Sequence, residues 1–432
     1  MSSETMSVMP QKPRKGFSLP HSARWPVGFL IAALALFALY YFVYYGPVDP
    51  DFKAWVQRWL SIASMNESLV WVMCALGLNV VVGYAGLLDL GFVAFWAIGG
   101  YTVGWFMSAF FQQWNVHVLG TGPETARGLH FNFWFVLILA GLICAAFGVL
   151  IGAPTLRLRS DYLALVTLGF GEIIPQIFYN GDDLWGFNLT NGTKGILPAD
   201  PVPAVAFDKE GVGFRDLGVF DHLSKYVIFV VFVAVIVFVS LRLREGRLGR
   251  AWLAIREDEL AASAMGVPLM RTKLSAYGIG AVAGGIGGAA FAILINGVLP
   301  DRFNFSISII LLAMVVLGGM GNVWGVIIGA LLISWVNSTG LPQAGNAINE
   351  TFDTNINFPS WSFLIFGATL VLMMLFRREG ILPEARTRLV LREPGRTEAE
   401  ALGADLEAPA PELDALPEIE VAGDSTNEGK RS

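Results

Sequence analysis

Long apolar stretches, separated by short polar or glycine-rich segments, recur along most of the chain. A helix that crosses a bilayer needs about 20 predominantly apolar residues. The pattern predicts an all-α polytopic membrane protein with about 10 transmembrane helices, of which the second, eighth and ninth are short. The ten predicted spans are Pro26–Tyr45, Leu69–Val82, Phe92–Phe111, Phe133–Ile151, Tyr162–Tyr179, Tyr226–Leu241, Leu274–Leu294, Phe305–Leu317, Val323–Val336 and Trp361–Phe376.

Composition supports this class. Of the 432 residues, 54% are apolar and only 15% are charged, whereas a soluble chain carries about a quarter charged residues. The first apolar stretch is too long and too poorly terminated for a cleaved signal peptide, so we expect an uncleaved span. Cys74 and Cys144 lie inside apolar spans, which excludes a disulfide framework and offers no metal-binding spacing.

The basic residues predict the orientation. The loop 242–273 holds seven Lys and Arg residues, and loops on the opposite side hold eight of the 29 in the chain. Because loops rich in Lys and Arg stay in the cytoplasm, we expect loop 242–273 and both termini to be cytoplasmic. The longest loop on the other side, 180–225, is then external, where it either contacts a delivery protein or caps the helix bundle.

Three regions follow from this reading. Residues 1–25 form a cytoplasmic N-terminal segment, and residues 26–378 form the transmembrane domain. Residues 379–432 form a tail that carries eleven Asp and Glu between Glu393 and Glu428. Because the tail is rich in Pro, Ala and Gly and almost free of aromatic residues, we expect it to be disordered.

Glu172 is a carboxylate about ten residues into the fifth span. An acidic residue at the centre of a transmembrane helix costs roughly 2.5–3.5 kcal/mol on insertion scales, so we expect it to face the bundle interior. Gln176 and Tyr179 follow at i+4 and i+7 and extend a polar stripe, and Pro175 removes a backbone donor beside it. The stripe indicates either a translocation path or gate, or an inter-helix anchor that touches no substrate.

Two glycine-rich breaks interrupt the apolar pattern, one containing Gly83 and Gly86 and one at 318–321. Breaks at membrane depth either line a cavity, which would add Gly83 and Gly86 to the path, or form tight turns, the interpretation we favour. Within the seventh span, glycine recurs at every fourth position, a spacing that lets helix backbones approach closely. These positions are Gly280, Gly284 and Gly288.

The basic loop contains one predicted helix. Residues 250–265 include neither Gly nor Pro, and Gly266 follows as a stop signal. Trp252, Ile255 and Glu259 share one stripe, whereas other charged residues lie elsewhere around the helix. This modest amphipathicity is typical of a helix that docks into a partner's groove or lies along the membrane surface.

Several chemistries are missing from the sequence. It contains no phosphate-binding loop of the G-x-x-x-x-G-K-[ST] type, so any ATP must be bound by another chain. All four His residues lie outside the predicted spans, which leaves no intramembrane His ligand set for a metal. No nucleophile–base constellation indicates catalysis.

Four strings carry a resemblance to a known family. They are GYAGLLDLGFVAFWAIGGY at 83–101, LRLRSDYLALVTLGFGEII at 156–174, GRAWLAIREDELAASAMGV at 249–267 and VVLGGMGNVWGVIIGALL at 315–332. In this order and with these gaps, the chain resembles the permease subunits of branched-chain amino acid ABC importers, most closely the larger, LivM-type permease. The resemblance extends from about Leu69 to Pro383.

The resemblance implies a heteromeric importer in the bacterial cytoplasmic (inner) membrane. Its parts would be two different permeases, two ATP-binding cassette subunits and a separate extracytoplasmic substrate-binding protein, with no nucleic acid. The chain itself would hold no cofactor, because ATP and Mg²⁺ belong to the partner subunits. The segment that couples the permease to the ATPase would include Arg250, Trp252, Arg256, Glu257, Asp258, Glu259 and Gly266.

The implied substrates are leucine, isoleucine and valine. Permeases for urea and short-chain amides share much of the pattern and form the alternative. An ion-coupled secondary transporter would require more intramembrane carboxylates than Glu172. A membrane-embedded enzyme would require a cluster of acids, His or nucleophiles at membrane depth, which the spans lack.

Overall fold

The computed structural model describes residues 24–119, 122, 125–157, 160–208, 211–353, 357–377 and 379–382. The predicted N-terminal segment and acidic tail fall largely outside these ranges. The helices are α1 (Arg24–Tyr45), α2 (Pro50–Trp59), α3 (Ile62–Leu78), η2 (Asn79–Tyr84), α4 (Val93–Phe106), α5 (Phe133–Thr155), α6 (Ser160–Tyr179), η3 (Gly192–Lys194), α7 (His222–Glu245), α8 (Arg247–Glu257), α9 (Glu259–Ala264), α10 (Leu269–Leu294), η4 (Pro300–Arg302), α11 (Phe305–Gly318), α12 (Val323–Trp335), η5 (Val336–Gly340), α13 (Leu341–Phe352), η6 (Phe358–Trp361) and α14 (Ser362–Phe376).

Each predicted apolar span coincides with a helix, which confirms the all-α polytopic prediction. Within the described ranges, nine helices are long and apolar enough to cross a membrane. The tenth apolar helix, α4, has 14 residues. At 1.5 Å per residue, a helix of that length reaches only about two thirds of the way across a hydrocarbon core of about 30 Å.

The third span is therefore shorter than predicted. After Phe106 the chain enters strand β1, where Met107 pairs with His130 of β3. Before α4 the chain from 85 to 92 is not helical, and Gly86 adopts a positive φ of 69°. The non-helical chain before α4 agrees with the predicted glycine-rich break, whereas apolar composition extended the predicted span to Phe111 because it does not distinguish helix from strand.

The second and ninth spans are longer than predicted. α3 runs without a break into the π-helical turn η2, and α12 runs through η5 into α13. Polar residues at the start of α3 lower its hydropathy, so the predicted span begins too late. These residues are tolerated because they are paired inside the bundle. Asn66 donates to the carbonyl of His222 at 2.8 Å, and the hydroxyl of Ser68 lies 2.9 Å from that of Ser334.

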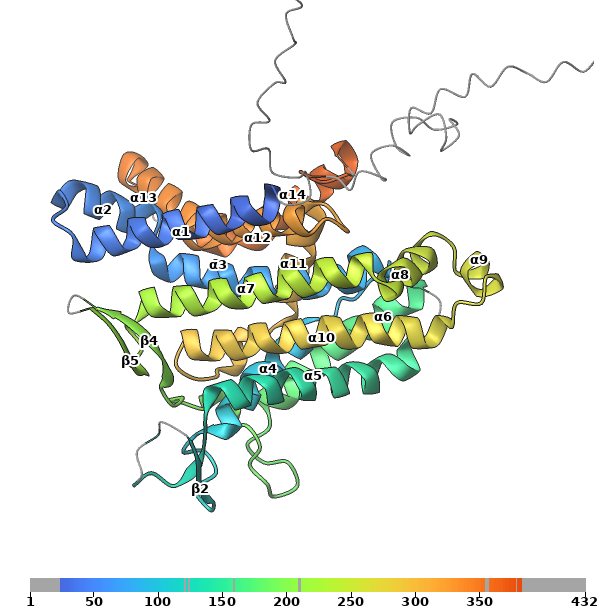
Figure 1. Ribbon diagram of the computed structural model, residues 1–432, viewed down its shortest axis with the longest axis horizontal. Helices are drawn as coiled ribbons and strands as arrows, with labels where there is room; N and C mark the ends of the chain where they lie inside the picture. The colour runs from blue at the N-terminus through green and yellow to red at the C-terminus, as the bar shows by residue number, and fades with distance from the viewer. Residues whose placement is uncertain are drawn as a thin grey trace, which may run out of the picture. The chain divides into compact units, whose positions relative to one another are not determined.

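α10 is the central helix of the bundle and packs against α3, α4 and α5 (Figure 1). Its predicted glycine stripe makes this packing possible. A Cβ at Gly288 would lie 2.1 Å from the carbonyl oxygen of Trp96, and a Cβ at Gly284 would lie 3.0 Å from the Phe92 ring. A Cβ at Gly280 would meet the Val81 side chain at 2.5 Å. The predicted packing role of these glycines is confirmed.

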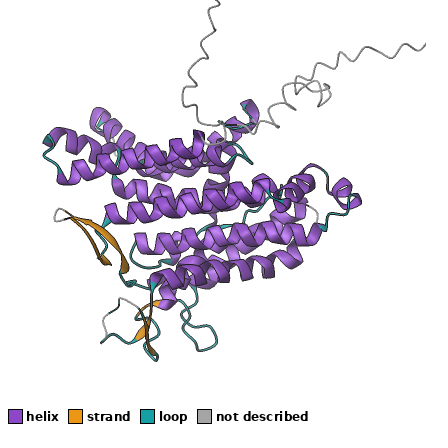
Figure 2. Cartoon of the chain, in the orientation of Figure 1, coloured by secondary structure: helices purple, strands orange, loops and turns teal. Residues whose placement is uncertain are grey.

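Short strands lie opposite the helix pair α8 and α9 (Figures 1 and 2). We call the end that carries α8 and α9 the basic end, and the end that carries the strands the hairpin end. A three-stranded sheet has the order β1-β3-β2, and β4 pairs with β5 in a hairpin inside the predicted external loop 180–225. The strands are β1 (Met107–Ser108), β2 (Asn115–Val118), β3 (Gly128–Phe131), β4 (Val202–Asp208) and β5 (Gly211–Leu217).

The glycine packing makes a first prediction. Gly288→Ala should force α10 away from α4 and lower the free energy of unfolding by about 1–3 kcal/mol, the usual cost of overpacking. The measurement is the thermal unfolding midpoint of the detergent-purified protein. Gly367→Ala in α14 is the control, because a Cβ there meets nothing within 4 Å. Equal midpoints for the two variants would contradict this account of the core.

Candidate functional site

Two helices form the predicted coupling segment at the basic end. The prediction of a single helix over 250–265 is wrong, because the chain breaks at Asp258, where φ is −155°. The Asp258 carboxylate accepts hydrogen bonds from the amides of Leu260 and Ala261 at 2.8 and 3.0 Å, which caps α9 and competes with continuation of α8. The predicted stop at Gly266 is confirmed, since its φ is +83° just after α9 ends.

Trp252 anchors α8 to the membrane helices. Its side chain is fully buried, with a relative exposure of 0%. The indole Nε1–H donates to the carbonyl of Thr272 at 3.0 Å and lies 3.1 Å from the Ser275 hydroxyl, both in α10. Its ring stacks on Tyr84 with a centroid separation of 6.4 Å. One tryptophan thus joins α8 to both α10 and η2.

Arg256 connects α8 to the first glycine-rich break. One guanidinium nitrogen donates to the carbonyl oxygen of Gly83 at 2.5 Å. A Cβ at Gly86 would lie 2.8 Å from Cγ of Arg256, and the positive φ at Gly86 itself favours glycine. Gly83 and Gly86, predicted as path residues, therefore lie against a residue of the predicted coupling segment.

The two glycine-rich breaks also contact each other. Asn79 of η2 accepts a hydrogen bond from the amide of Gly321 at 2.9 Å, and a Cβ at Gly83 would lie 2.6 Å from that same amide nitrogen. The second break is a tight turn with positive φ at Gly319 and Gly321, as predicted. The first break instead begins inside a π-helical turn.

An ion pair ties α9 to the start of α10. Lys273 Nζ lies 2.6 Å from Glu259 Oε1, and the exposed fractions of the two side chains are 8% and 46%. Arg250 donates to the carbonyl of Glu245 at 2.9 Å on the surface. The outer side of the pair exposes acidic and apolar side chains together, among them Glu257, Asp258, Leu260 and Met265.

The polar stripe of α6 forms a separate group. Glu172, Gln176 and Tyr179 are exposed in this chain, so the structure does not bear out the expectation that Glu172 faces the bundle interior. The opposite side of α6 is the buried one. A Cβ at Gly171 would lie 3.1 Å from Cα of Gly91.

Side chains that the sequence analysis did not single out hold the start of α4. The hydroxyl of Thr167 accepts from the amide of residue 90 at 3.1 Å, and the hydroxyl of Ser308 accepts from the amide of residue 93 at 3.0 Å. Asp89 accepts from the amide of residue 91 at 2.8 Å. An Asp two residues before a Gly is a signature of such a turn, whereas nothing local marks Thr167 or Ser308.

A polar pocket of about 370 Å³ lies beside β1 at the hairpin end. Its polar lining is uncharged and includes Ser108, Gln112, Asn188 and Asn191. Nearby, Nδ1 of His130 and Oδ2 of Asp200 lie 2.8 Å apart, and both side chains are buried. Burial raises the pKa of Asp200, and the hydrogen bond from His130 partly offsets that shift.

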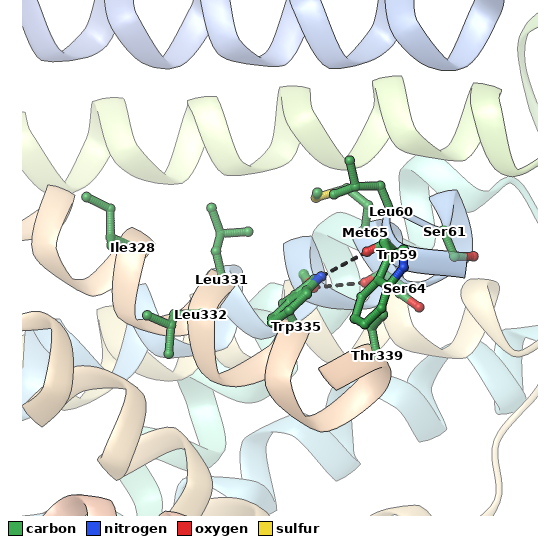
Figure 3. A pocket seen from close by; sticks show the side chains of 11 residues that line it. Trp59, Leu60, Ser61, Ser64, Met65, Ile328, Leu331, Leu332, Trp335 and Thr339 are labelled. Carbon is green, nitrogen blue, oxygen red and sulfur yellow. Dashed lines mark hydrogen bonds between the residues drawn. The ribbon is translucent and has the colours of Figure 1, made fainter. Parts of the chain in front are cut away.

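A second pocket, of about 340 Å³, lies between the start of α3 and α12 (Figure 3). Trp335 donates its indole N–H to the carbonyl of Trp59 at 2.9 Å across its rim. The lining is apolar apart from hydroxyl groups such as those of Ser61 and Ser64. It contains no charged side chain that could pair with an ionic solute.

Comparisons with known proteins agree on one family. Residues 61–374 match the model of the branched-chain amino acid transport system permease component. The chain is 39% identical over 346 residues to the high-affinity branched-chain amino acid transport system permease protein LivM of Salmonella typhimurium, covering 77% of this chain and 72% of that protein.

Two further relatives have the same kind of name. The LivM protein of Escherichia coli is 39% identical, covering 75% of this chain and 70% of the relative. A probable branched-chain amino acid transport permease of Methanocaldococcus jannaschii is 24% identical, covering 75% and 95%. No solved structure matches the chain.

The anchoring of α8 makes a second prediction. Trp252→Ala removes a buried side chain, a change that typically costs 3–5 kcal/mol. We expect the amide protons of α8 to lose protection from hydrogen–deuterium exchange by roughly a hundredfold or more. Leu260→Ala is the control, because that side chain is 81% exposed and its loss should leave exchange unchanged. Unaltered exchange in Trp252→Ala would show that the tryptophan does not hold α8.

Proposed function

Because the chain belongs to the family of branched-chain amino acid transport system permease components, we propose that it is a membrane-spanning subunit of an ATP-driven importer of leucine, isoleucine and valine. A binding protein would deliver the amino acid on the hairpin side. Two ATP-binding cassette subunits would bind at the basic end, and a second permease would complete the membrane part. The family match over residues 61–374 carries this proposal.

The proposed orientation places the basic end in the cytoplasm of a bacterial cell, with the protein in the inner membrane. The concentration of Lys and Arg in loop 242–273 supports this. The α8 and α9 pair would then project toward the ATPase. Its exposed surface mixes acidic and apolar side chains with Arg247 and Arg250, and this mixture suits a protein groove better than an anionic lipid surface, which would attract a uniformly basic helix.

The proposed coupling runs through three contacts described above. Motion of the helix pair would reach α10 through Trp252 of α8 and the Lys273–Glu259 pair of α9, and would reach η2 through Arg256 on the Gly83 carbonyl. Since α10 is packed without room for a methyl group against α3 and α4, a shift at its start would move its neighbours too. We therefore assign Gly83 and Gly86 to the coupling link.

The translocation path is proposed along the exposed stripe of α6. An amino acid carries an ammonium and a carboxylate, and Gln176 and Tyr179 offer hydrogen bonds to such a zwitterion beside the Glu172 carboxylate. The apolar pocket in Figure 3 suits a zwitterion poorly, because its lining carries no charge. The polar pocket beside β1 is a better point of entry from the hairpin side.

Transport by the assembled complex gives a third prediction. The chain, purified from its native membrane in mild detergent, should bring ATPase activity with it. A binding protein loaded with leucine, isoleucine or valine should stimulate that activity. Stimulation by urea or a short amide instead would retain the importer class and change the substrate. Solute movement down an ion gradient without any ATPase partner would overturn the proposal.

The docking surface gives a fourth prediction. Leu260→Ala and Glu257→Lys alter exposed side chains of the helix pair, so each should weaken binding of the ATP-binding subunit roughly fivefold or more, as for an interface position worth about 1 kcal/mol. Binding can be titrated in detergent with labelled subunit. Leu372→Ala, on the exposed side of α14, should have no effect. Unchanged binding in both helix-pair variants would exclude this surface as the docking site.

A further inference from the structure

The outer face of α6 differs in chemistry from the exposed faces of α5 and α14. α5 and α14 contain no charged residue between Phe133 and Thr155 or between Ser362 and Phe376. Their exposed side chains are apolar and suit contact with lipid. The outer face of α6, which we define by its exposed residues Leu165, Glu172, Ile173, Gln176, Ile177 and Tyr179, instead exposes a carboxylate and an amide.

The depth of Glu172 makes that face unsuited to lipid. Glu172 is seven residues before the end of α6 at Tyr179, about 10 Å along the helix. The neighbouring Gly171 packs against Gly91, just before α4 begins, and against Phe305, where α11 begins. The carboxylate therefore lies level with the starts of α4 and α11 and within the candidate membrane span Tyr162–Tyr179, where an ionised group requires a polar partner.

A second copy of this chain is a poor candidate for that partner. In a two-fold symmetric dimer the same patch faces itself. A patch centred on Glu172 would then bring two carboxylates together, and like charges at close range in a medium of low dielectric constant repel strongly. Charge complementarity requires a different chain that presents a cation or a hydrogen-bond donor at this depth.

We propose that the outer face of α6 is the contact surface for a second, non-identical permease subunit, which places a Lys, Arg or other donor side chain opposite Glu172. This inference rests on the proposed function, since it assigns a surface to one of the partners named there. It also explains how a helix so little buried within its own chain can carry a carboxylate. The solute path would then run between two different subunits, with Glu172 at its narrowest, paired point.

Site-specific photocrosslinking tests the surface directly. A photoreactive benzoylphenylalanine replaces Ile177 on α6 or, as the matched control, Leu372 on α14; these side chains are 43% and 54% exposed. Both variants are expressed with all other subunits of the transporter and keep Glu172. Position 177 should crosslink to the other permease, identified by mass spectrometry, whereas position 372 should not. No protein crosslink from 177, or only a crosslink between two copies of this chain, would overturn the inference.

Charge substitution tests the partner's chemistry. Glu172→Lys should reduce co-purification of the second permease at least tenfold, and Glu172→Gln, which keeps a hydrogen-bonding group, should reduce it less. A Lys or Arg of the partner located by the crosslink and changed to Glu should restore pairing with Glu172→Lys. If Glu172→Lys fails to accumulate in the membrane, the crosslinking pair decides the question alone. Equal co-purification of Glu172→Lys and the parent would count against a cationic or donor partner.

The ATPase assay separates the two proposals. If the parent complex shows ATPase activity stimulated by an amino-acid-loaded binding protein but position 177 gives no crosslink to another subunit, the surface assignment fails and the proposed function stands. If no stimulated ATPase activity accompanies the chain, the proposed function fails, and the surface assignment fails with it.

Discussion

A chain that leaves its helix inside a bilayer must satisfy its freed amide and carbonyl groups within the protein, because lipid offers no hydrogen bonds. Side chains, several of them from distant parts of the chain, meet this requirement by hydrogen bonding to the freed backbone groups. The amides of residues 90, 91 and 93 donate hydrogen bonds to Thr167 of α6, to Asp89 and to Ser308 of α11, respectively. The acceptors come from separate parts of the chain, so satisfying one short break fixes how α4, α6 and α11 meet.

The same requirement joins the membrane helices to the helix pair at the basic end. The carbonyl oxygen of Gly83 accepts a hydrogen bond from the guanidinium of Arg256, 173 residues away in sequence. The surrounding packing leaves no room for a side chain, since Gly83 lies against the turn at Gly321 and Gly86 lies against the methylene groups of Arg256. A displacement of α8 is therefore transmitted to the membrane helices and is not absorbed by a flexible segment between them. An ATP-driven permease requires this mechanical property.

The number and order of the apolar helices could be predicted from the sequence, because a helix that spans a membrane requires a long run of apolar residues. The sequence was a poor guide to their lengths, since Asn66 and Ser68 read as polar but are paired across helices. Periodicity also cannot reveal which distant residue an arginine will reach, so the contact between Arg256 and Gly83 was beyond it. For Glu172, the cost of an intramembrane carboxylate led to the expectation of a position inside the bundle, but the side chain is exposed in this chain, because that cost does not specify which chain surrounds the carboxylate.

The number of solute molecules transported per ATP hydrolysed, measured in proteoliposomes for Arg256→Gln, tests the central claim most directly. The outer surface of the helix pair is unchanged in this variant, so the ATPase should still dock and hydrolyse ATP. If the Arg256–Gly83 contact transmits motion to the membrane helices, transport should fall severalfold while hydrolysis persists, and the ratio should drop with it. A ratio equal to that of the parent would show that coupling does not depend on this contact.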